Sequence, residues 1–261
     1  MLGLRHARGL AREQRLAVLL LRPARQWLAS APGLPLGPRL GHGGKTQPRR
    51  EPKLGALAGS EAARAAQALA SKIYGLDKVR RVPGKGELER LGAEVALRAA
   101  DMSSKSLSLT LWAYARLRRV PANTAQAELD AAVGIRLGEF SAQSLANSLW
   151  AYATMGRPPA AALQARIDEH VARTLGEFKA QELANSLWAY AKMGRPPAAA
   201  LQARIDEHVA RTLGVFNAQD LANSLWAHAK MGRPLAAALQ ARIDEHVELT
   251  LGEFRDRKSG E

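Results

Sequence analysis

The sequence predicts an all-α fold, a right-handed α-solenoid of about five stacked helical hairpins. The first observation behind this prediction is a set of tryptophans that follow one another at a fixed interval: Trp112, Trp150, Trp188 and Trp226. The second is that residues 142–159, AQSLANSLWAYATMGRPP, recur with few changes at 180–197 and 218–235. A fixed period of this size is typical of stacked repeats. One hairpin cannot cover its own apolar face, so neighbouring units must stack.

The period divides the chain into a leader, a repeat array and a tail. Residues 1–57 are expected to form a transit peptide and a disordered basic linker, and 255–261 a polar tail. The array is predicted over 58–254. Its units are expected at about 63–100, 101–138, 139–176, 177–214 and 215–252. The first two units have diverged, whereas the last three are nearly copies of one another.

The leader has the composition of an organellar import signal. Arginines and leucines alternate through it, and Glu13 is its only acidic residue before Glu51. Arg-rich, acid-poor amphipathic segments of this kind are typical of transit peptides. Ser30 and Thr46 are its only hydroxyl residues, which favours a mitochondrial location over a plastid one. The alternative is a basic tail on a cytosolic or nuclear protein.

Each unit is predicted to be a hairpin of a helix A and a helix B. In the third unit, helix A is expected over about 142–155 and helix B over about 160–175. Gly156 is expected to end helix A and Gly176 to end helix B. Pro158 and Pro159 suit the entry to helix B, where a missing N–H costs little. Each helix A is expected to pack on the next.

Composition narrows the possible functions. The chain has no cysteine, which excludes disulfides, cysteine-based zinc sites and thiol catalysis. No apolar run is long enough to span a membrane. The formal charge is +14, but residues 1–57 hold 11 basic residues against 2 acidic ones, and 58–261 hold 27 against 22. The array is close to neutral, so the high total charge is weak evidence for nucleic-acid binding.

The segment LANSLWAYAKMGRPP, preceded by a phenylalanine and Ala-Gln, resembles the octotricopeptide repeat. The resemblance covers roughly 101–254, and 63–100 more weakly. It rests on these residues and their equivalents one period away: Phe178, Gln181, Leu183, Ala184, Asn185, Leu187, Trp188, Ala189, Ala191, Gly194 and Pro197. Related arrays occur in FAST-kinase-like proteins and in repeat subunits of RNA-editing substrate-binding complexes, and many such proteins carry a C-terminal RAP-type domain. No RAP-type domain is recognisable in this sequence.

The resemblance implies an RNA-binding protein of mitochondria or plastids that is not an enzyme and needs no cofactor. Its partner would be single-stranded organellar RNA, and its role would lie in transcript processing, stability, editing or translation. No capping helix follows the last unit near Leu251 and Phe254. The chain is therefore expected either to be a fragment or to bind other proteins of an RNA-processing complex at this end.

Helical-repeat RNA readers use a few side chains of the inward-facing helix to read one base per unit. If helix A lines the concave face, its polar arc supplies the candidates, with asparagine and glutamine for base edges and lysine for phosphate. They are Gln143, Ser144, Asn147, Thr154, Gln181, Glu182, Asn185, Lys192, Gln219, Asp220, Asn223 and Lys230. The positions that vary between units, 144/182/220 and 154/192/230, are the best candidates for specificity. Ala151, Ala189 and Ala227 have small side chains and are expected to let the backbone of a ligand approach this surface.

Other interpretations of these residues stay open. The asparagines suit either base reading or a hydrogen-bonded ladder along the stack, and the tryptophans are predicted to be core. Three arginines beside the hairpin turns suit either phosphate contacts or a solvated loop: Arg157, Arg195 and Arg233. Acidic residues at 182 and 220 weigh mildly against purely electrostatic binding.

One repeated cluster suggests catalysis at first sight. Asp168, Glu169 and His170 recur at 206–208 and 244–246, and such groups serve in acid–base or metal sites. Consecutive residues on a helix point in different directions, however, and an enzyme rarely needs three copies of one site. The cluster is predicted to be the solvated face of helix B. The alternatives to RNA binding are a protein–protein interaction scaffold, or an array that belongs to a longer protein with a catalytic domain.

Overall fold

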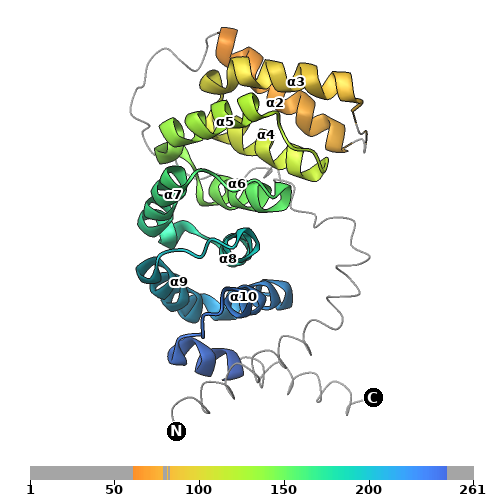
Figure 1. Cartoon of the computed structure of the whole chain (residues 1–261). Helices are drawn as coiled ribbons and strands as arrows, with labels where there is room; N and C mark the ends of the chain where they lie inside the picture. Colours follow the sequence, from red (N-terminus) through yellow and green to blue (C-terminus); the bar gives the residue numbers. More distant parts are fainter. Residues whose placement is uncertain (1–60, 79–80, 82, 246–261) are drawn as a thin grey trace, which may run out of the picture.

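The computed structural model describes residues 61–78, 81 and 83–245. The fold is an all-α solenoid in which the helices alternate between two layers (Figure 1). Layer A comprises α2 (Glu61–Lys78), α4 (Ser104–Arg116), α6 (Ala142–Met155), α8 (Ala180–Met193) and α10 (Ala218–Met231). Layer B comprises α3 (Lys85–Arg98), α5 (Asn123–Arg136), α7 (Ala161–Thr174), α9 (Ala199–Thr212) and a further helix whose described part is 237–245. The predicted solenoid is confirmed.

Several predictions fall outside this range. The leader, the tail and the C-terminal end near Leu251 and Phe254 lie outside the described residues. Among the helices that are described, none has the length and apolar character needed to cross a membrane. The divergent first unit keeps the spacing of the others, because the interval from Lys85 at the start of α3 to Asn123 at the start of α5 equals the interval between successive tryptophans.

The two helices of a unit end in different ways. Gly156 ends α6 in the left-handed conformation, with a φ of 65°, as predicted. In the second unit the same position is Arg118, which adopts a φ of 53° although a side chain is strained there. The predicted role of Gly176 is wrong. It lies inside a 3₁₀ turn, η3 (Leu175–Glu177), that extends α7 without any left-handed residue.

Small side chains bring the layer A helices close together. Consecutive layer A helices pack far more extensively on one another than consecutive layer B helices do. Ala146 and Ser148 are buried in α6, and Ser108 Oγ of α4 donates to the carbonyl oxygen of Ser144 in α6 at 3.0 Å. A stack whose helices are closer in one layer bends towards that layer, so layer A is the inner one. The prediction that helix A packs on helix A is confirmed.

This close packing overturns one expectation. Three alanines predicted to lie on the exposed surface are fully buried: Ala151, Ala189 and Ala227. Layer A helices are covered around most of their circumference by neighbouring helices, so the exposed arc is narrower than a two-faced helical wheel suggests.

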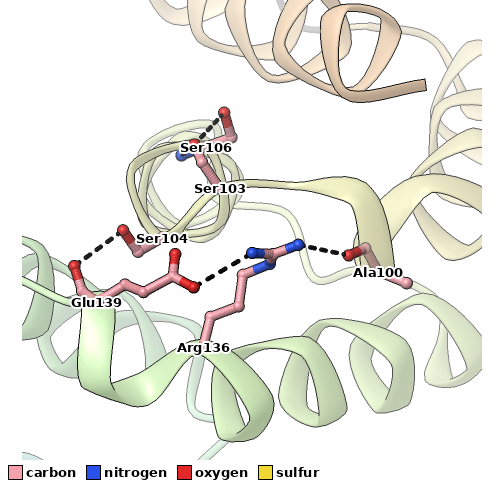
Figure 2. Close-up of polar contacts among 6 residues, drawn as sticks. All are labelled: Ala100, Ser103, Ser104, Ser106, Arg136 and Glu139. Carbon is pink, nitrogen blue, oxygen red and sulfur yellow. Dashed lines mark hydrogen bonds and ion pairs between the residues drawn. The ribbon is translucent and has the colours of Figure 1, made fainter. Parts of the chain in front are cut away.

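Polar contacts join each unit to the next at the links between helices. Figure 2 shows residues of two such links: Ala100 and the start of α4, between the first and second units, and the end of α5 with Glu139, between the second and third. Arg136 donates to the carbonyl oxygen of Ala100 at 3.2 Å and pairs with Glu139 at 3.3 Å. Ser104 Oγ donates to the carbonyl oxygen of Glu139 at 3.1 Å. Ser103 caps α4 by accepting a hydrogen bond from the Ser106 N–H.

A buried hydrogen bond, which we call the latch, connects layer A of one unit to layer B of the unit before it. Tyr152 donates to Asp130 at 2.7 Å, and Tyr190 donates to Asp168 at 2.7 Å. A glutamine one turn earlier donates to each aspartate. In the last unit His228 replaces the tyrosine, and its Nε2 lies 2.9 Å from Asp206 Oδ1.

The latch corrects the interpretation of the Asp-Glu-His cluster as a solvated face. Asp168 takes part in the latch. His170 is buried, with its Nε2 3.2 Å from the carbonyl oxygen of Phe140, in the link that precedes α6. Only Glu169 is exposed. The three side chains point in different directions, as expected of consecutive residues on a helix, and two of them hold the stack together.

We expect Asp168→Asn to gain stability relative to the unchanged chain as the pH rises. Burial raises the pKa of the Asp168 carboxyl, although hydrogen bonds from Tyr190 and Gln164 act in the opposite direction. Because the folded pKa lies above the unfolded one, the folded chain binds more protons between them, and stability falls as the pH rises through that window. Asparagine keeps the acceptor oxygen but carries no charge.

Urea unfolding between about pH 4 and pH 7 measures this difference. The free energy of unfolding of Asp168→Asn, minus that of the unchanged chain, should increase over this range. Glu169→Gln, at the exposed neighbouring position, is the control. A difference for Asp168→Asn that stays constant with pH would contradict the expectation.

Candidate nucleic-acid interface

One narrow face of each layer A helix reaches the inner surface. In α6 it carries Gln143, Asn147, Trp150 and Thr154, which are four, three and four residues apart and so share one side of the helix. The same positions in successive helices form what we call the inner stripe. Its members are Gln67, Ser71 and Tyr74 in α2; Lys105, Leu109, Trp112 and Arg116 in α4; Gln143, Asn147, Trp150 and Thr154 in α6; Gln181, Asn185, Trp188 and Lys192 in α8; and Gln219, Asn223, Trp226 and Lys230 in α10.

The tryptophans occupy the middle of the inner stripe, and the prediction that they are core is only partly right. Trp112 is 5% exposed, whereas Trp150, Trp188 and Trp226 are partly exposed and pack their other side against the core. The rings follow one another along the stack. Ring centroids are 6.5 Å apart between Trp112 and Trp150 and 6.3 Å apart between Trp188 and Trp226.

The spacing of residues in the sequence indicates that the tryptophans share a face with the polar residues of the inner stripe. Trp150 is seven residues after Gln143, and seven residues are nearly two full turns of a helix. The two side chains must therefore lie on the same face.

The amide side chains flank the tryptophans. Gln143 and Gln181 are exposed, Asn147 and Asn223 are partly exposed, and Asn185 is 6% exposed. In α10, Gln219 Nε2 donates to Asn223 Oδ1 at 3.0 Å, within one helix. Among the described helices, no hydrogen bond joins the asparagines of successive units. The alternative of an asparagine ladder is therefore wrong.

Lysines stand at the end of the inner stripe in the last two layer A helices. Lys192 and Lys230 are exposed, and Thr154 occupies the same position in α6. Arg116, the equivalent residue of α4, lies over the Trp112 ring at 5.4 Å and pairs with Asp77 at 3.3 Å. No member of the inner stripe is a carboxylate. The stripe thus combines aromatic rings, amides and cations without any acidic residue.

One of the two sets of positions predicted to determine specificity, 144/182/220, forms hydrogen bonds at the helix N-termini instead. Ser144 donates its N–H to Ser141 Oγ, and Glu182 accepts a hydrogen bond from the Lys179 N–H at 2.9 Å. Asp220 accepts from the Asn217 N–H, is 4% exposed, and has a carboxyl pKa that burial raises. Residues at this third position of a helix complete capping boxes. The base-reading role predicted for these three is not part of our proposal.

The arginines beside the hairpin turns reach back to the preceding unit. Arg157 donates to Asn123 Oδ1 at 2.8 Å, and Arg195 donates to the carbonyl oxygen of Pro159 at 2.6 Å. Arg233 lies at the same turn in the last unit. These contacts support the stack, which neither of the two interpretations from sequence anticipated.

A hollow of about 570 Å³ lies over the inner stripe where α2, α4 and α6 meet. The ring of Tyr74 forms part of its wall, whereas Trp112 contributes little because it is only 5% exposed. Lys105, Asn147 and the carboxylate-bearing Glu139 form another part. The predicted site residues of α6 therefore border a concave surface large enough for a nucleotide-sized group.

Comparisons with protein-family models and with curated proteins gave no match to this chain. What the sequence and the structure establish together is an array of paired helices that repeats at the interval of the tryptophans.

Proposed function

We propose that the inner stripe binds single-stranded RNA and that the chain is an octotricopeptide-type RNA-binding protein. The observation that carries the proposal is the recurrence of two amides and a tryptophan on one face of α6, α8 and α10, joined by a lysine in α8 and α10, with no carboxylate among them. Proteins that bind single-stranded nucleic acid stack bases on aromatic side chains and contact the backbone with cations. Helical repeats present such groups once per unit.

The composition of the leader supports a mitochondrial location, with a plastid as the alternative. A role in the processing, stability, editing or translation of organellar transcripts follows from the resemblance and the location together. These steps use proteins that recognise one transcript among many, and a repeated reading surface suits that task.

A protein-binding scaffold is the second candidate, and one observation favours it. Leu97 and Ile135 are 77% and 80% exposed and hold equivalent positions in α3 and α5 of layer B. Two large apolar side chains at adjacent positions on a surface are typical of protein contacts. They lie in the layer opposite the inner stripe, so the two functions need not compete for one surface.

Salt-dependent RNA binding tests the proposed function. Lys192→Ala combined with Lys230→Ala removes the two exposed cations at the end of the inner stripe. We expect RNA affinity to fall, and the slope of log affinity against log salt to become shallower by roughly 1.4 units, because each of the two lysines on a phosphate of a single strand contributes about 0.7 to the slope. Fluorescence anisotropy of a labelled single-stranded RNA with the full chain provides the measurement.

Arg204→Ala combined with Arg242→Ala is the matched control, since it removes the same charge from exposed positions in layer B. An equal loss of affinity in both double variants would place the binding outside the inner stripe. Binding that hardly changes with salt, or none at physiological salt, would favour the scaffold instead.

A further inference from the structure

We propose that α6, α8 and α10 together recognise a run of three consecutive adenines in RNA. This inference rests on the proposed function and adds to it the chemistry of the RNA that is read. It follows from which positions of the inner stripe are the same in successive units and from the hydrogen-bonding groups that they present.

Three successive units carry the same three residues on the inner stripe, although Asn185 in α8 is only 6% exposed and the amide contact of α10 is not repeated in α6 or α8. Glutamine, asparagine and tryptophan occupy the first three positions of the inner stripe in α6, α8 and α10 alike, and only the fourth position changes. In α4 the first two positions are Lys105 and Leu109. A leucine side chain has no donor or acceptor, so this helix lacks the pair of amides. Three equal readers in a row require three equal bases in a row.

The contact between the two amides in α10 fixes what they present to a ligand. Gln219 Nε2 donates to Asn223 Oδ1 at 3.0 Å, which occupies one glutamine donor and the asparagine acceptor. The asparagine amide keeps two N–H donors, and the glutamine keeps its carbonyl acceptor. A donor and an acceptor therefore stand side by side next to the Trp226 ring.

Adenine and cytosine both offer an amino donor beside a ring-nitrogen acceptor, and adenine combines this pair with the larger ring for stacking. The N6 amino group of adenine donates beside the acceptor N7 on one edge and beside the acceptor N1 on the other, and asparagine and glutamine are its usual partners. A purine also covers more of an indole ring than a pyrimidine does. Guanine presents neighbouring donors on its pairing edge, which carboxylates accept, and no member of the inner stripe is a carboxylate.

Two RNAs of identical composition provide the test. Both are 12-mers that contain three adenines among uridines and cytidines, contiguous in one and separated in the other; homopolymers of adenosine, uridine and cytidine are compared with them. With the full chain we expect the contiguous RNA to bind about tenfold tighter than the separated one, and the adenosine homopolymer to bind tightest of the three.

Substitutions of the asparagines in the inner stripe test whether they cause the preference for contiguous adenines. Asn147→Leu, Asn185→Leu and Asn223→Leu, made together, reproduce the leucine of α4 and should reduce the preference to less than about twofold while stacking keeps part of the affinity. Asn223→Leu alone, at a partly exposed position, provides the same test if the triple variant does not keep its helical circular dichroism.

The possible outcomes separate the two proposals. Equal binding of the contiguous and separated RNAs would overturn the adenine run and leave RNA binding intact. Tighter binding of the uridine or cytidine homopolymer would overturn adenine as the base. If no RNA bound at physiological salt, both this inference and the proposed function would fail.

Discussion

Tyr190→Phe is expected to lower the free energy of unfolding by about 1–3 kcal/mol, whereas Tyr114→Phe is expected to change it little. Both tyrosines are buried at equivalent positions in layer A. Tyr190 donates to the partly buried Asp168, so its loss removes one of the hydrogen bonds that compensate for the burial of this carboxylate. Among the residues that the structure describes, the Tyr114 hydroxyl has no hydrogen-bond partner, so a phenylalanine there removes nothing but a buried polar group.

The difference between the two tyrosines comes from one residue of layer B. Gly92 occupies the position in α3 that Asp130 occupies in α5, so the first pair of units has no latch. Burial without a partner raises the pKa of Tyr114 to about 12. Urea unfolding of both variants, followed by circular dichroism, makes the comparison. Equal destabilisation by the two substitutions would show that the latch hydrogen bond contributes nothing.

The second large effect concerns RNA. Trp188→Leu is expected to weaken the binding of single-stranded RNA by about 10-fold to 100-fold, because stacking of a base on an aromatic ring contributes about 1–3 kcal/mol. The Trp188 ring is partly exposed on the inner stripe and packs against the core with its other side. Leucine keeps apolar contact with the core but offers no ring to a base.

Trp112→Leu is the matched control for this prediction. Trp112 holds the same position in α4, the layer A helix before α6, but it is only 5% exposed, and Arg116 lies over its ring. A base therefore has little access to it, and RNA affinity should change by less than about threefold. Equal losses in the two variants, with unchanged helical circular dichroism, would refute stacking on the exposed tryptophans.

The repeat period was sufficient to predict the fold, because every unit repeats the same apolar pattern and the same turn residues. Gly156 was predicted correctly as a helix end, since a left-handed position after a helix strongly favours glycine. The end of helix B was not, because a 3₁₀ turn needs no distinctive residue. Neither the latch nor the burial of His170 was evident in the sequence, since both depend on contacts between residues of different helices or links, far apart in the chain.

The candidate site was predicted in part, for an equally physical reason. Nine of the predicted polar residues lie on the inner stripe, because a helix of known register fixes which side chains share a face. Glu182 and Asp220 were misjudged because a carboxylate three residues into a helix caps its N-terminus before it serves anything else. Which of the other predicted residues are exposed depends on how much of each helix its neighbours cover. The sequence pattern of a single helix does not show this.

The most direct test of the central claim is the fluorescence of the stripe tryptophans during an RNA titration. Trp27 lies outside the inner stripe, so the Trp27→Phe chain isolates the signal of the tryptophans of the repeat array. We predict that single-stranded RNA quenches this fluorescence and that the quenching saturates at the same RNA concentration as binding measured by anisotropy. RNA binding that saturates while the fluorescence stays unchanged would contradict the claim that bases stack along the inner stripe.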